Sequence, residues 1–139
     1  MKPDPSTTRA PFRFRLDAHS GVPVYRQLID QVQAGIASGT LAAGDQIPTV
    51  RQVAVDLAIN PNTVLRAYRE LEIRGTLDSQ QGTGTFISDQ KPPPDDGDRE
   101  RRLESLVTEV VARAGSGGFT VVELMDAMRA RLPEGSKRR

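Results

Sequence analysis

The sequence predicts a mainly α-helical fold with a small β-hairpin, followed by a short region of two helices. Apolar residues recur at helical spacing in segments separated by glycine and proline, which indicates amphipathic helices. Between residues 47 and 87, two such segments are short and joined by a tight turn, and a glycine-bearing hairpin follows them. This order of elements is typical of a winged helix-turn-helix, a module that places the end of one helix in the DNA major groove.

Composition limits the classes of protein to consider. The 139 residues suit one domain with a small appendage, and the lack of cysteine excludes disulfides, thiolate metal sites and a cysteine nucleophile. The N-terminal residues lack the apolar run of a signal peptide, and no segment approaches the ~20 apolar residues of a membrane span. We therefore expect a cytoplasmic protein with no membrane partner.

Net charge does not by itself indicate a nucleic-acid partner. Residues 1–90 hold nine Lys/Arg and nine Asp/Glu, and residues 91–139 hold ten and nine. A DNA-binding surface must therefore depend on where a few cations lie, since phosphate contacts need only a few well-placed donors.

Shifts in composition divide the chain into five regions. A polar, proline-rich stretch precedes the first apolar segment, and a triple proline flanked by aspartates separates the hairpin from the last helices. We expect a disordered tail (1–11), a winged helix-turn-helix domain (12–89), a Pro/Asp-rich linker (90–98), a two-helix dimerisation region (99–133) and a basic tail (134–139).

The predicted DNA-binding domain begins with a short strand and a first helix. Apolar and basic residues alternate from Phe12 to Leu16, which predicts a strand with one buried face. Pro23 suits the first position of a helix, and Gly39 suits its end. The apolar stripe between them, which includes Tyr25, is expected to lie in the core.

Capping signals define the next two helices. Thr49 and Gln52 match a capping box, in which each side chain satisfies a free backbone N–H group. Asn60 suits an N-cap and Pro61 the first position of the following helix. Strands at 76–79 and 85–88 are expected to pair around a turn at 80–84. The third helix is expected to bury Val64, Ala67, Tyr68 and Leu71.

The start of the third helix and the hairpin tip carry the candidate DNA contacts. A helix N-terminus in the major groove brings its first side chains to base edges, where asparagine matches adenine and arginine matches guanine or a phosphate. The candidates are Arg51, Asn60, Asn62, Thr63, Arg66, Gln81, Gly82 and Thr83. Each type also has an ordinary structural role, since asparagine caps helices, exposed arginine is solvated and glycine forms turns. The order of the elements is what favours DNA.

Two helices after the linker are too small to bury their own apolar surface, because domains below ~40 residues usually need a further partner. A second copy of the chain is the simplest partner, and a stripe that folds back on the N-terminal domain is the alternative. The candidate dimerisation residues are Leu103, Leu106, Val107, Val110, Val111, Leu124, Met125 and Met128.

The sequence does not indicate an enzyme. His19 lies in a loop and is expected to be a solvated residue, no glycine-rich phosphate loop follows a strand, and no metal-ligand spacing is present. We expect no catalytic residues, no metal and no cofactor, and the sequence names no small-molecule effector.

The central segment resembles the GntR family of bacterial transcription factors, and the resemblance covers residues 22–87. The matching motifs are PVYRQL at 23–28, GTL at 39–41, GDQIP at 44–48, TVR at 49–51, NPNT at 60–63, AY at 67–68, EL at 70–71, Gly75 and GTGTF at 82–86. The chain departs from some relatives at two positions, since Pro61 and Leu65 stand where those relatives carry basic residues.

This resemblance implies a dimeric winged helix-turn-helix that binds a pseudo-palindromic operator. Of the two regulatory signs that the sequence leaves open, repressor and activator, we expect a repressor. The family contacts fall on Arg51, on the start of the third helix (Asn60, Asn62 and Thr63) and on the wing tip (Gln81 and Gly82). The short C-terminal region is similar to that of the YtrA-type subfamily, in which two helices dimerise. The alternative function is a winged helix used for protein–protein contact, which near-zero net charge would suit.

Overall fold

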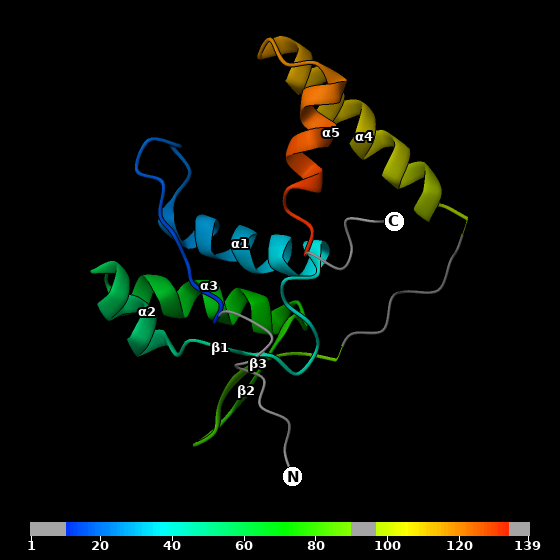
Figure 1. The fold of residues 1–139 in the computed structure, drawn as a ribbon. Helices are drawn as coiled ribbons and strands as arrows, with labels where there is room; N and C mark the ends of the chain where they lie inside the picture. The colour runs from blue at the N-terminus through cyan, green and yellow to red at the C-terminus, as the bar shows by residue number, and fades with distance from the viewer. Residues whose placement is uncertain (1–10, 90–96, 134–139) are drawn as a thin grey trace. The chain divides into compact units, whose positions relative to one another are not determined.

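The computed structural model describes residues 11–89 and 97–133, which fall into two compact units divided between Gln90 and Lys91 (Figure 1). The predicted basic tail (134–139), nearly all of the predicted N-terminal tail (1–11) and most of the predicted linker (90–98) lie outside the described residues. None of the helices in the described ranges combines the length and apolar character that crossing a membrane requires.

The first unit combines helices with a small antiparallel sheet. Its helices are α1 (Val24–Ser38), α2 (Val50–Leu57) and α3 (Pro61–Ile73), and its strands are β1 (Gln46–Ile47), β2 (Leu77–Gln80) and β3 (Gly84–Ile87). The strand order is β1-β3-β2. In Figure 1, α1 and α3 lie side by side, and the β2–β3 hairpin projects away from them. The predicted winged helix-turn-helix is therefore present.

Both predicted capping arrangements of this unit are present. Thr49 Oγ1 accepts from the Gln52 N–H at 3.1 Å, and Gln52 Oε1 accepts from the Thr49 N–H at 2.8 Å. Asn60 Oδ1 accepts from the backbone N–H of Asn62 at 2.8 Å, and Pro61 is the first residue of α3. Because these bonds are local, α2 and α3 start where the sequence predicts.

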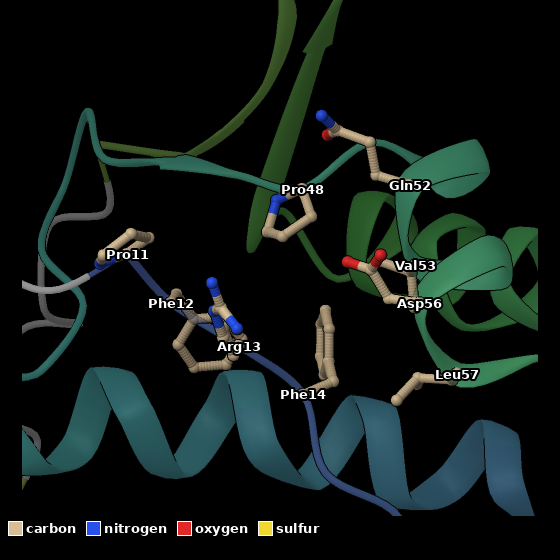
Figure 2. A pocket seen from close by; sticks show the side chains of 9 residues that line it. All are labelled: Pro11, Phe12, Arg13, Phe14, Pro48, Gln52, Val53, Asp56 and Leu57. Atoms are coloured by element: carbon tan, nitrogen blue, oxygen red, sulfur yellow. The ribbon is translucent and has the colours of Figure 1, made fainter.

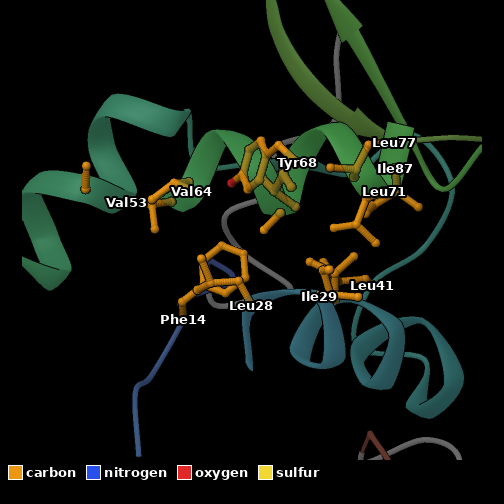
Figure 3. Close-up of a cluster of buried hydrophobic side chains, with 14 residues drawn as sticks. Phe14, Leu28, Ile29, Leu41, Val53, Val64, Tyr68, Leu71, Leu77 and Ile87 are labelled. Atoms are coloured by element: carbon orange, nitrogen blue, oxygen red, sulfur yellow. The ribbon is translucent and has the colours of Figure 1, made fainter. Parts of the chain in front are cut away.

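One hydrophobic core joins the elements of this unit (Figure 3). Its largest fully buried side chains are Leu28, Ile29, Ile47, Leu71, Val32 and Val64. Helix α3 buries all four of the residues predicted for its core face. Tyr68 contributes a ring to this core and donates its hydroxyl to the Pro48 carbonyl, and burial raises the pKa of Tyr68. The third helix is therefore held by packing along its length.

The predicted strand at 12–16 is wrong, although its alternation is real. Phe14 is buried and its neighbours Arg13 and Arg15 are exposed, but the segment is not a strand. The side chain of Gln31 takes the place of a neighbouring strand. Its Oε1 accepts from the Arg15 N–H at 2.9 Å, and its Nε2 donates to the Arg15 carbonyl at 2.6 Å. A side-chain amide of α1 thus fixes the segment.

Two further details of the first unit differ from the prediction. Strand β1 lies in a stretch predicted as a connection, and it pairs with β3 through Gln46 opposite Phe86 and Ile47 opposite Thr85. Pro23 is the N-cap of α1 rather than its first residue. A two-residue strand has no sequence period of its own, so only its partner reveals it.

The second unit is a helical hairpin of α4 (Arg99–Ser116) and α5 (Val121–Arg129). Thr120 opens α5 with the predicted capping box, and its Oγ1 accepts from the Glu123 N–H at 3.1 Å. Helix α5 ends before the predicted limit at Pro133. Within the described part of this unit, Ala114 alone is buried, so the hairpin has almost no core of its own.

Candidate nucleic-acid interface

The first turn of α3 presents polar side chains to solvent while the opposite face of the helix is anchored in the core. Asn60 and Asn62 are exposed, and Thr63 is half-buried. The Oδ1 atom of Asn60 accepts the capping hydrogen bond from the Asn62 N–H. The side-chain amide of Asn62 makes no hydrogen bond within the described residues. Asn62 is therefore the asparagine of this turn whose amide is free to match an adenine edge.

Three arginines of the helix pair are exposed and unneutralised. Arg51, Arg66 and Arg69 form no ion pair with any carboxylate of the described residues. In the same unit, Arg26 of α1 pairs with Asp30 at 3.5 Å, and Arg74 at the C-terminal end of α3 pairs with Glu70 at 3.0 Å. Arg13 and Arg15 of the N-terminal segment are likewise exposed and have no ion pair among the described residues. The three free cations of α2 and α3 give this surface a local attraction for phosphate that the net charge conceals.

Arg66 is stacked on an aromatic ring, a contact that the sequence analysis missed. Its guanidinium carbon lies 3.8 Å from the centroid of the Tyr25 ring. Tyr25 is half-buried at the start of α1 instead of being fully in the core. The spacing of apolar residues places Tyr25 correctly on the inner side of α1, but it gives no signal of a partner on another helix.

The hairpin tip is braced by Gln46, which the sequence analysis also missed. The Thr83 N–H donates to the Gln80 carbonyl at 3.0 Å and closes the turn, in which Gly82 has a φ of 82°. The Nε2 of Gln46 donates to the Thr83 carbonyl at 3.3 Å, and a Cβ at Gly84 would collide with this amide. The predicted contacts at this tip, Gln81, Gly82 and Thr83, are all exposed.

A hollow of 500 Å³ lies between the start of α2 and the wing, lined by Thr49 and residues 79–85. The hollow brings together the N-cap of α2 and both strands of the hairpin, and its lining residues are threonine, serine, glutamine and glycine. The hydroxyl, amide and backbone N–H groups of these residues are the kinds of donor through which proteins contact a phosphate backbone.

A separate cavity of 560 Å³ opens between the N-terminal segment and α2 (Figure 2). The rings of Phe12 and Phe14 lie on one side with centroids 4.9 Å apart, and Arg13 and Asp56 supply opposite charges. None of the predicted DNA contacts lines this cavity, so it is distinct from the surface formed by the start of α3 and the wing tip.

The second unit exposes much of its predicted dimerisation surface. Leu103, Leu106 and Val107 of α4 are 51–55% exposed, and Met125 and Met128 of α5 are 45% and 50% exposed. The other predicted residues, Val110, Val111 and Leu124, are half-buried. Three apolar residues that were not predicted are also exposed, namely Phe119, Val121 and Val122. We call the exposed residues of both sets the apolar face of the second unit.

The capped helix pair, the core-anchored third helix and the braced hairpin together define a DNA-binding regulator of the winged helix-turn-helix class. Residues 24–87 match the family described as "Bacterial regulatory proteins, gntR family". The chain belongs to this family, as a relative that it matches over most of its length also shows. The predicted fold class and family are therefore confirmed.

Relatives of this chain carry names of transcription regulators. It is 44% identical over 115 residues to the HTH-type transcriptional regulator Rv1152 of Mycobacterium tuberculosis, covering 83% of this chain and 88% of that protein. It is 40% identical over 75 residues to the HTH-type transcriptional repressor YtrA of Bacillus subtilis, covering 54% of this chain and 58% of that protein. The chain therefore spans little more than half the length of that repressor.

A solved structure gives the same result. YtrA from Sulfolobus acidocaldarius, a GntR-family transcription factor, is similar with a TM-score of 0.53 and 27% identity, over 71% of this chain and 97% of that one. The similarity to YtrA proteins places this chain among the YtrA-like members of the family.

Proposed function

We propose that this chain binds a pseudo-palindromic DNA operator as a homodimer and represses transcription. The start of α3 carries the DNA-binding part of the proposal. It combines the free amide of Asn62 with unneutralised Arg51, Arg66 and Arg69 on a rigid helix pair. Sequence-specific DNA binding requires a side chain that hydrogen-bonds a base edge together with cations that contact the neighbouring phosphates, and this surface offers both.

The apolar face of the second unit supports the dimer. Eight large apolar side chains of α4, α5 and their connection are 45–67% exposed. A contiguous exposed apolar surface on a small unit usually marks an interaction site. A two-fold dimer would repeat one recognition helix about one DNA turn away, at ~34 Å, which matches a pseudo-palindromic site. Repression is the role named for the similar Bacillus subtilis YtrA.

The test is a selection of random duplex DNA on the full chain, followed by binding of the selected duplex across salt concentrations. We expect a two-fold symmetric motif and a steep fall of affinity with salt, because cations that contact phosphates release counterions. No enriched motif together with a flat salt dependence would instead favour the protein-contact function.

Two substitutions test the assigned residues. Asn62→Ala is expected to relax preference at one base pair of each half-site, at a cost of about 1–3 kcal/mol per half-site. Arg51→Ala is expected to weaken binding to all sequences and lower the salt slope by about 0.9 per half-site. The matched control is Arg26→Ala, since Arg26 is an exposed arginine already paired with Asp30. Normal affinity in folded Asn62→Ala and Arg51→Ala variants would contradict the site assignment.

A further inference from the structure

The stacked pair of Tyr25 and Arg66 joins the start of α1 to the second turn of α3. The 3.8 Å between the guanidinium carbon and the ring centroid lies well inside the ~6 Å range of a cation–π contact. Tyr25 is half-buried while Arg66 is exposed, so a ring seated against the protein holds a cation that faces solvent. The pairing therefore fixes one of the unneutralised arginines of the proposed interface.

Stacking determines which ligands this arginine is able to reach. A guanidinium on a ring uses its flat face, and the N–H groups along its edge remain free to donate. Asn62 lies one turn earlier on the same side of α3, since residues four apart are neighbours on a helix. Arg66 is turned toward α1 and lies along the protein surface, so it is not extended ahead of Asn62 into a groove. A guanidinium held along the protein surface in this way is placed to contact the DNA phosphates at the edge of the groove.

We propose that Tyr25 is a positioning residue for DNA binding. Its ring holds Arg66 so that the guanidinium edge contacts a backbone phosphate beside the base pair that Asn62 reads. The ring limits the conformations of a long side chain before DNA arrives, and this lowers the entropic cost of the contact. The inference rests on the proposed function, because it assigns roles within that same DNA-binding surface.

The experiment is a double-mutant cycle on the full chain, measured on the duplex obtained by selection. Tyr25→Leu removes the ring, Tyr25→Phe keeps it, and Arg66→Gln removes the charge. We expect Tyr25→Leu to weaken binding about two- to fivefold per half-site, or about four- to 25-fold for a dimer on both half-sites. Tyr25→Phe should bind like the unaltered chain. In the Arg66→Gln background, Tyr25→Leu should have no further effect.

Arg66→Gln alone provides a second measurement that does not depend on how well Tyr25→Leu folds. We expect it to lower the salt slope by about 0.9 per half-site and to leave the order of preferred bases unchanged, since phosphate contacts carry no sequence information. A changed preference at one base pair would overturn the phosphate assignment. Equal losses from Tyr25→Leu with and without Arg66, or no loss at all, would overturn the positioning role.

These results separate the inference from the proposed function. If Asn62→Ala and Arg51→Ala weaken binding while the Tyr25 and Arg66 variants do not, the inference fails and the proposed function stands. If none of these variants weakens binding, the proposed surface itself is wrong. Thermal unfolding of each variant measures whether Tyr25 also stabilises the packing of α1 on α3. If Tyr25 serves only that packing, Tyr25→Leu lowers the melting temperature, and its effect on DNA affinity is the same with and without Arg66.

Discussion

Replacing Val107 with alanine tests the proposed dimer at one point of the apolar face. Val107 is 51% exposed, so about half of its side chain is available for burial by a partner. The substitution removes two carbon groups worth about 0.8 kcal/mol each when fully buried, and half exposure leaves about 0.8 kcal/mol to be gained on association. A symmetric dimer contains two such positions, so about 1.6 kcal/mol is lost, and the dimer Kd rises about 15-fold.

Sedimentation equilibrium over a range of protein concentrations, without DNA, measures this change. The matched control is Val55→Ala, because Val55 is 73% exposed on α2 and lies outside the second unit. We expect the control to leave the Kd unchanged. An unaltered Kd in Val107→Ala, or an equal loss in both variants, would refute the assignment of this face to dimerisation. A chain that stays monomeric at high concentration would refute the dimer itself.

Two further predictions concern the wing and the core, and chemical denaturation measures both. Gly84→Ala should lower the free energy of unfolding by more than Gly82→Ala, because both glycines have positive φ but only a Cβ at Gly84 meets the amide of Gln46; equal losses would contradict this reasoning. Burial raises the pKa of Tyr68, so the folded state keeps a proton that the unfolded state releases above pH ~10. Stability should therefore be insensitive to this group below pH ~10 and fall above it, and Tyr68→Phe should remove that fall at a cost of about 1 kcal/mol for the lost hydrogen bond to Pro48. If the free energy of unfolding of Tyr68→Phe decreases above pH ~10 as it does in the unaltered chain, the decrease comes from groups other than Tyr68.

The sequence predicted the parts of the fold that depend on neighbours in the chain. The caps at Thr49 and Asn60 use bonds to residues two or three positions away, so their residue types suffice. The apolar spacing of α3 likewise identified its buried face. These local signals were enough to locate the helix pair and hence the surface proposed for DNA.

Features that depend on distant parts of the chain escaped prediction. Gln46 braces the wing only because the hairpin folds back beside it, and Tyr25 meets Arg66 only because α1 packs along α3. The segment around Phe14 has the alternation of a strand, but its partner is a glutamine side chain. Periodicity reports which side of a segment is buried, and it does not report what lies opposite.

The pairing of Gln31 with the backbone of Arg15 has a consequence for self-association. A true strand beside α1 would expose a row of unpaired N–H and C=O groups, and such edges invite pairing with other chains and aggregation. The glutamine amide supplies one donor and one acceptor, and it satisfies a single residue without extending a sheet. The N-terminal segment thereby contributes Phe14 to the core, and the N–H and C=O groups of the next residue, Arg15, are already bonded within the protein and are not open to a strand of another chain.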